Sequence, residues 1–115
     1  MRQNAEIHLF AGLILLGTIE AKVVDASMGV IGGTLKPTAA YFVNYQLFFK
    51  VHLETPDWKG LAALDLKAAS PLTGELTAEG GIVITDVTGQ EGITEIDADV
   101  CGISYQQMNR LFLDV

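Results

Sequence analysis

The sequence has little of what enzyme and metal sites are built from. Its 115 residues include one cysteine, Cys101, and two histidines, His8 and His52. These residues do not have the spacing of zinc ligands, and one cysteine cannot form an intramolecular disulfide. The nucleophile-elbow motif G-x-S-x-G is also absent, so nothing indicates a serine nucleophile activated by a base. We therefore expect no cofactor, no metal and no catalytic residues, and we favour a protein that is not an enzyme.

Positive charge is scarce as well. Seven lysines and arginines stand against fourteen aspartates and glutamates, which gives a formal net charge of −7. Such a surface repels the phosphates of nucleic acids and the headgroups of anionic membranes. The composition thus predicts no nucleic-acid partner and no membrane partner, whereas a basic protein partner is compatible with it.

Long apolar runs are missing too. No stretch approaches the roughly 20 apolar residues of a membrane-spanning helix. The run at 9–17, LFAGLILLG, is a poor signal peptide because Glu6 lies in its would-be basic region and no cleavage site follows. A single cysteine fits a reducing compartment. We therefore expect a cytoplasmic protein.

Apolar residues, by contrast, are abundant. They make up half of the chain, while 18% of residues are charged, and the mean hydropathy is +0.35. This excess predicts either a dense core or an apolar surface that is buried between subunits. The length predicts one domain over residues 1–115.

Alternation of apolar and polar residues predicts strands in both halves of the chain. The first of these segments is one strand or a bent pair broken at Gly12, with a turn at Gly17 and Thr18 after it. A glycine-bearing hairpin connection, TGQEG at 88–92, joins the last two. A short helix capped by Ser104 is expected over 104–112. The predicted strands are residues 6–16, 18–26, 61–68, 81–87 and 93–103.

Residues 41–54 fit two interpretations. Every odd position is apolar, as in a strand, but helical spacing also gathers aromatic residues on one face. The length of the segment, Pro37 before it and Pro56 after it favour a helix. We therefore predict an α+β fold in which an antiparallel sheet of about five strands packs on one long helix. If the segment is a strand, the alternative is an all-β barrel.

Glycines gather in the stretch 27–38, SMGVIGGTLKPT. The pattern matches neither the P-loop nor the dinucleotide fingerprint, and Lys36 is the one basic residue within it. We expect Gly29, Gly32 and Gly33 to serve a turn or bulge between a strand and the helix, rather than a phosphate site.

Two features on the expected surface are candidates for binding. Glu95, Asp97 and Asp99 alternate on one face of a predicted strand, as either an ordinary solvated face or a patch for a basic partner. Trp58 lies in a predicted loop, where it either folds over the edge of the core or anchors a partner.

The predicted helix carries a second apolar side. Val43, Leu47 and Val51 recur at i, i+4 and i+8, away from the Tyr41 and Phe49 face that should meet the sheet. We interpret these three residues as an oligomer interface, most simply of a homodimer. The alternative is that the C-terminal segment covers them through Leu111 and Phe112 within one subunit.

Two functions from different classes follow from these features. The favoured one is a small, acidic, non-enzymatic binding or interaction protein that acts as a homo-oligomer. The alternative is a small-molecule-binding protein or enzyme with a pocket between helix and sheet, lined by Tyr41, Tyr45 and His52.

Overall fold

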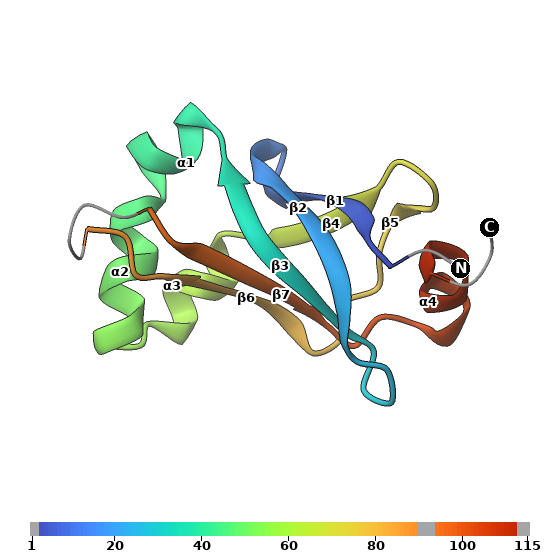
Figure 1. Ribbon diagram of the computed structural model, residues 1–115. Coiled ribbons are helices and arrows are strands. Elements are labelled where there is room, and N and C mark those ends of the chain that lie inside the picture. The colour runs from blue at the N-terminus through green and yellow to red at the C-terminus, as the bar shows by residue number, and fades with distance from the viewer. Residues whose placement is uncertain (1–2, 90–93, 113–115) are drawn as a thin grey trace.

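Seven antiparallel strands form one curled sheet in the computed structural model, which describes residues 3–89 and 94–112 (Figure 1). The order of strands across the sheet is β5-β4-β1-β2-β3-β7-β6. The strands are β1 (Ala5–Ala11), β2 (Ile14–Asp25), β3 (Val30–Pro37), β4 (Leu66–Ser70), β5 (Gly74–Glu75), β6 (Gly81–Asp86) and β7 (Ile96–Cys101).

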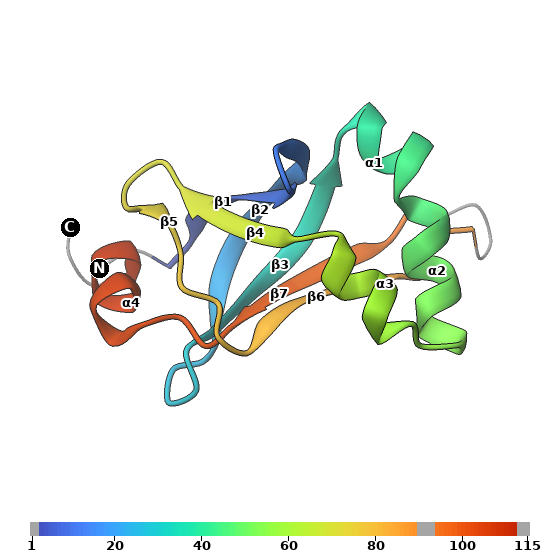
Figure 2. The ribbon, with the colours of Figure 1, turned by 180° about the vertical axis from the view of Figure 1, so that it is seen from behind.

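The described residues also form four short helices. Three lie between β3 and β4 and gather at one end of the sheet, whereas the fourth follows β7 and lies at the other end (Figures 1 and 2). None of them is long and apolar enough to cross a membrane. The helices are α1 (Ala39–Asn44), α2 (Gln46–Glu54), α3 (Trp58–Ala63) and α4 (Tyr105–Phe112).

This architecture corrects the predicted fold. About five strands on one long helix were expected, but the sheet has seven strands and curls into a half-barrel. Residues 41–54 are helical rather than extended, which removes the premise of the all-β alternative. They form two helices instead of one, because the backbone leaves helical geometry at Tyr45, where φ is −126°.

The first hairpin turns earlier in the chain than expected. Gly12 has a φ of +59°, in the left-handed region that glycine adopts without strain, and it occupies the turn between β1 and β2. Gly17 lies inside β2 instead of in a turn. A Cβ at this position would collide with the carbonyl oxygen of Lys36 on β3, so glycine is needed here for close approach of two strands.

The glycine-rich stretch is mostly strand, so the predicted turn is wrong for Gly32 and Gly33. Both lie in β3, between β2 and β7. A Cβ on Gly32 would collide with the carboxylate of Asp99, and one on Gly33 would lie 2.7 Å from a carbonyl oxygen of β2. Gly29 does occupy a turn, with a φ of +66°. The glycines therefore allow the strands to approach one another closely.

The later elements differ from their predicted bounds to unequal degrees. The predicted strand 61–68 is the end of α3 followed by β4, whereas β6 lies within the predicted 81–87. The helix α4 is confirmed with its cap, since the Ser104 Oγ accepts a hydrogen bond from the Gln107 N–H at 3.2 Å. The predicted connection 88–92 falls largely on residues 90–93, which lie outside the described residues.

The concave face of the sheet carries the core. Alternate residues of each long strand point inward, as Ile7 and Leu9 do from β1, and are fully buried. Tyr41 and Phe49 close one end of the half-barrel from α1 and α2, with their rings stacked 6.0 Å apart. Leu111 of α4 closes the other end. The outward sides of the helices and of the sheet are left for contacts with other molecules.

Candidate functional site

The helical segment is fixed to the sheet at Thr38 and Tyr41. Thr38 caps α1, its Oγ1 accepting a hydrogen bond from the Tyr41 N–H at 3.3 Å and donating to the Leu15 carbonyl at 2.7 Å. The buried Tyr41 hydroxyl donates to Asp86 Oδ2 at 2.7 Å. Since Asp86 ends β6, this bond joins α1 to an edge strand of the sheet.

Asp86 is a buried carboxylate whose charge is stabilised by its neighbours. Only 2% of its surface is exposed. Burial raises the pKa of Asp86, but hydrogen bonds from Tyr41 and Thr88 lower it by more, so the pKa stays below its ordinary value. Burial and the nearby carboxylate both raise the pKa of Tyr41. Neither group titrates near neutral pH, so the pair is built as a structural link.

The three residues of the predicted pocket do not share an open cavity. Tyr41 is completely buried and takes part in the core. Tyr45 packs against the core from the junction of α1 and α2. His52 lies near the surface, where its Nδ1 accepts a hydrogen bond from the Asp57 N–H at 2.8 Å and its ring stacks on Phe48 at 5.6 Å. Tyr41 therefore fills the space beside it and does not line an opening with Tyr45 and His52.

Trp58 is the first residue of α3 rather than part of a loop. Asp57 caps this helix, its Oδ1 accepting a hydrogen bond from the Gly60 N–H at 2.9 Å. The Trp58 side chain is 69% exposed, so it does not cover the edge of the core. Its ring meets that of His52 edge-on, with 4.9 Å between centroids. Trp58 therefore lies at the surface.

The outward side of α1 and α2 is an exposed apolar surface. Val43, Leu47 and Val51, here called the apolar helix surface, are 79%, 76% and 51% exposed. Leu111 and Phe112 are the buried residues of α4, and α4 lies at the opposite end of the molecule (Figure 1). They therefore do not cover this surface. Within residues 3–89 and 94–112, the three side chains stay open to solvent.

The two helices are also electrically neutral. Residues 39–54 contain one lysine, Lys50, and one glutamate, Glu54, whose formal charges cancel when His52 is counted as neutral. The whole chain carries −7. The apolar helix surface therefore lies on a part of the molecule that does not repel a second copy of the same chain.

A hollow of about 400 Å³ adjoins the apolar helix surface at Val51. It lies between α2 and the end of β6, and its apolar wall is formed by Val51, Leu53 and Val87. Lys50 and Glu54 also line it. The apolar surface thus continues from the helix into a depression, and does not end at Val51.

The predicted acidic residues lie near one another on the outer face of the sheet. Asp97 is exposed and Asp99 half-buried on β7, where they alternate with buried apolar residues, and Glu95 is exposed just before the strand. Burial and, secondarily, the charge of Asp97 raise the pKa of Asp99. The repulsion between the two carboxylates is thus only partly relieved.

Lysines share this outer face, which the sequence did not indicate. Gly32 pairs with Asp99 on one side and with Lys22 of β2 on the other. A shallow hollow above Gly32 is lined by both acidic and basic side chains, among them Glu20, Lys22 and Lys36. The outer face is therefore of mixed charge and not uniformly acidic.

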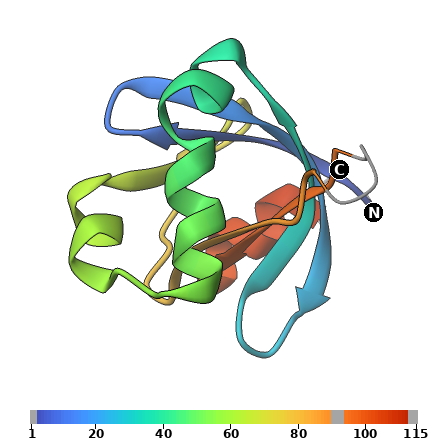
Figure 3. The same ribbon diagram turned by 90° about the vertical axis from the view of Figure 1, so that its left-hand side faces the viewer.

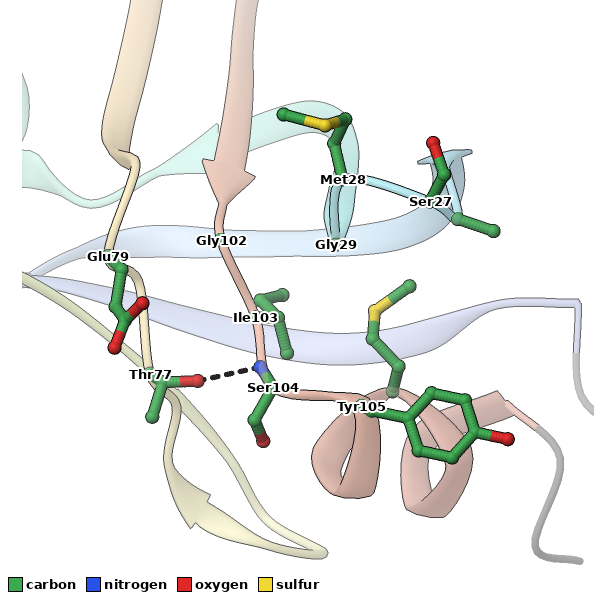
Figure 4. A pocket seen from close by; sticks show the side chains of 11 residues that line it. Ser27, Met28, Gly29, Thr77, Glu79, Gly102, Ile103, Ser104 and Tyr105 are labelled. Atoms are coloured by element: carbon green, nitrogen blue, oxygen red, sulfur yellow. Dashed lines mark hydrogen bonds between the residues drawn. The ribbon is translucent and has the colours of Figure 1, made fainter.

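A further hollow, of about 320 Å³, lies between the β2–β3 turn and the start of α4 (Figure 4). Met28 borders it from the turn and Tyr105 from the helix, while the Ser104 N–H donates to Thr77 Oγ1 at 2.8 Å at its side. Glu79 is the one carboxylate among its lining residues, which include no histidine or cysteine. Ser27, which also lines it, donates its hydroxyl to Asp25 Oδ1 at 2.7 Å. Sequence reasoning missed it because its residues come from three separate stretches of the chain without a shared pattern.

In the part of the chain that the structure describes, no group of three or more His, Cys, Asp or Glu side chains is placed so that it could hold a metal ion. Comparisons with protein-family models, with curated proteins and with solved structures find no match to this chain. Among the surfaces, the apolar helix surface carries three exposed aliphatic side chains at helical spacing, which is unusual for an ordinary solvated surface.

Proposed function

We propose that the chain is a small, acidic, non-enzymatic interaction protein that acts as a homo-oligomer through its apolar helix surface. The observation that carries this proposal is the exposure of Val43, Leu47 and Val51 at 79%, 76% and 51% on one side of the helices. Water-exposed aliphatic side chains in a row are typical of a surface that is covered in the working assembly.

The energetics fit a reversible association. Full burial of one valine or leucine side chain contributes about 1.5–3 kcal/mol. Three such side chains from each copy are comparable in sum with the roughly 4–15 kcal/mol lost in translational and rotational freedom. The neutral charge of residues 39–54 adds no repulsion. A net gain of about 8 kcal/mol lies within the range left between burial and lost freedom, and it corresponds to the micromolar dimer that we expect.

Replacing Leu47 with lysine tests the proposal. Leu47 is 76% exposed within one copy, so Leu47→Lys should leave the fold intact while placing a charge in the interface. Light scattering at high micromolar concentration should give a dimer for the unmodified protein and a monomer for the variant. Leu72→Lys is the matched control, because Leu72 is also exposed but lies between β4 and β5.

Two results would contradict this function. One is a monomeric unmodified protein at the same concentration. The other is a Leu47→Lys variant that unfolds, since that would place Leu47 in a core instead of an interface.

A basic protein is the partner that we propose for the outer sheet face. The raised pKa of Asp99, caused by burial and then by Asp97, supports this, because a cation beside the pair would relieve the repulsion. Pentalysine, used as a probe at low salt, should shift the amide signals of residues 95–99 saturably. Equal shifts over the whole surface would contradict a defined patch.

We propose that this assembly works in the cytoplasm. Cys101 is a free, half-buried thiol. Burial and, secondarily, the charge of Asp99 raise the pKa of Cys101, which keeps the thiol protonated and unreactive. Such a thiol is compatible with a reducing compartment. Fractionation of the cells that produce the protein tests this, and its recovery outside the cytoplasm would contradict it.

A further inference from the structure

The apolar helix surface combines a protrusion with a depression. Val43, on α1, is its most exposed side chain. Val51, on α2, borders the hollow of about 400 Å³ beside the end of β6. Leu47 lies midway between them in the sequence, four residues from each. A surface that pairs with its own copy across a two-fold axis must be self-complementary in this way.

We propose that two copies pair through antiparallel helices about a two-fold axis at Leu47, so that Val43 of each copy enters the hollow beside Val51 of the other. The inference rests on the proposed function and specifies its geometry. When helices run antiparallel about Leu47, residues equally far before and after it lie level with each other. Each protruding valine is then level with the partner copy's depression.

The break at Tyr45 leaves the three side chains accessible from one side. Hydrogen bonds of the α-helical i to i−4 type continue through the junction, from the Tyr45 N–H to the Tyr41 carbonyl at 2.9 Å and from the Phe49 N–H to the Tyr45 carbonyl at 3.2 Å. Figure 3 shows α1 and α2 following one another along the same end of the sheet. Val43 and Leu47 are accordingly both exposed, although they belong to different helices.

Charge selects the antiparallel direction. Parallel pairing would place Lys50 beside Lys50 and Glu54 beside Glu54 of the other copy, and it would align the two helix dipoles. Antiparallel pairing places Lys50 level with Asn44 of the other copy and Glu54 level with Ala40, so no like charges meet. The dipoles then oppose one another, which is the favourable arrangement for adjacent helices.

The hollow has the chemistry to receive an aliphatic side chain. Part of its wall is formed by Val51, Leu53 and Val87, which offer dispersion contacts to an inserted valine, while Asp86 and Thr88 also line it. Lys50 and Glu54 provide charged groups along the same hollow. Apolar contacts with polar groups around them are the usual arrangement of a protein interface.

Cross-linking of single-cysteine variants tests the geometry. Val43→Cys, Leu47→Cys and Val51→Cys are made separately in a Cys101→Ala background, which removes the native thiol. With a short thiol-to-thiol reagent, Leu47→Cys should cross-link with itself. Val43→Cys and Val51→Cys should cross-link efficiently when mixed and at least tenfold less when each is alone. Leu72→Cys, from the far end of the molecule, should stay uncross-linked.

The other outcomes overturn the inference in distinguishable ways. Efficient self-cross-linking of Val43→Cys and of Val51→Cys, with no gain on mixing, indicates parallel helices and refutes the antiparallel pair. A dimer by light scattering in which none of the three helix variants cross-links places the interface elsewhere. Monomers by light scattering, with no cross-linking, refute the proposed function itself.

Discussion

The Tyr41–Asp86 pair determines how firmly the helices are held on the sheet. The tyrosine hydroxyl donates to the carboxylate at 2.7 Å in a buried setting, and the Thr88 N–H donates to the other carboxylate oxygen at 2.8 Å. A hydrogen bond to a buried charge contributes more than one between neutral groups. The attachment of the helices to the sheet thus includes a side-chain hydrogen bond between residues 45 positions apart.

Replacing Tyr41 with phenylalanine should weaken this link. The ring and its stack on Phe49 are kept, while the buried carboxylate of Asp86 loses a donor. We expect the free energy of unfolding to fall by about 1–3 kcal/mol in urea titrations. Tyr105→Phe is the control, since that side chain is exposed and should leave stability unchanged.

The same variant should respond differently to acid. The pKa of Asp86 is lower in the folded protein than its ordinary 3.8, so its stabilising contribution is complete above 3.8 and is lost as pH falls through the lower folded value. Tyr41→Phe removes a hydrogen bond that lowers this pKa while burial still raises it. Thermal melts between pH 6 and 2 should therefore show a smaller loss of stability on acidification in the variant, because its folded pKa lies nearer the ordinary value. Parallel pH profiles for the two proteins would contradict this role.

At the scale of elements, β3 depends on two glycines for different reasons. A Cβ on Gly33 would meet a backbone carbonyl oxygen of β2 at 2.7 Å, whereas the nearest atom to a Cβ on Gly32 belongs to the Asp99 side chain. A side-chain end can rotate away, but a paired strand cannot. Gly33→Ala should accordingly lower the free energy of unfolding by about 1–3 kcal/mol, and Gly32→Ala by less. Chemical denaturation of both variants checks this, and an equal loss would contradict it.

The sequence predicted the strands whose inward residues are apolar. The alternation of β6 and β7 and the cap of α4 at Ser104 are local signals, and the structure contains all three elements. The strand β3 was missed because Gly32 and Gly33 supply no side chains to the alternation. The start of β4 was misplaced because Leu61 and Leu64 suit a helix as well as a strand, and both pack against the core from α3 and its end.

The candidate site was predictable to the extent that it follows from helical periodicity. Val43, Leu47 and Val51 were assigned to one side by their spacing, and they are exposed together. The sequence grouped Tyr41 with Tyr45 and His52, but no local pattern reveals that Tyr41 bonds to Asp86, a contact between distant residues. The hollow beside Val51 also depends on β6 packing near α2, which only the fold provides.

At the scale of the whole molecule, salt should not weaken the contacts of the apolar helix surface, but it should weaken the repulsion between the acidic parts of two copies. The proposed interface contains no ion pair to be screened, while two copies of a chain with charge −7 repel each other at long range. Raising the salt concentration should therefore leave the dimer equally stable or strengthen it slightly. Sedimentation equilibrium at 0.05 and about 0.5 M salt measures this, and a tenfold weakening would indicate an interface held by charge.

The order of strands in the sheet has a consequence for how the chain emerges during synthesis. β1, β2 and β3 form a meander of sequence neighbours, which can pair as soon as they leave the ribosome. The outer edge of β1 pairs with β4, which follows the helices α1 to α3 in the sequence. The outer edge of β3 pairs with β7, which comes later still, after β6. The nascent protein therefore exposes the edge of β1 until β4 has been made and the edge of β3 until β7 follows. Binding by a chaperone during this interval would protect it most from aggregation.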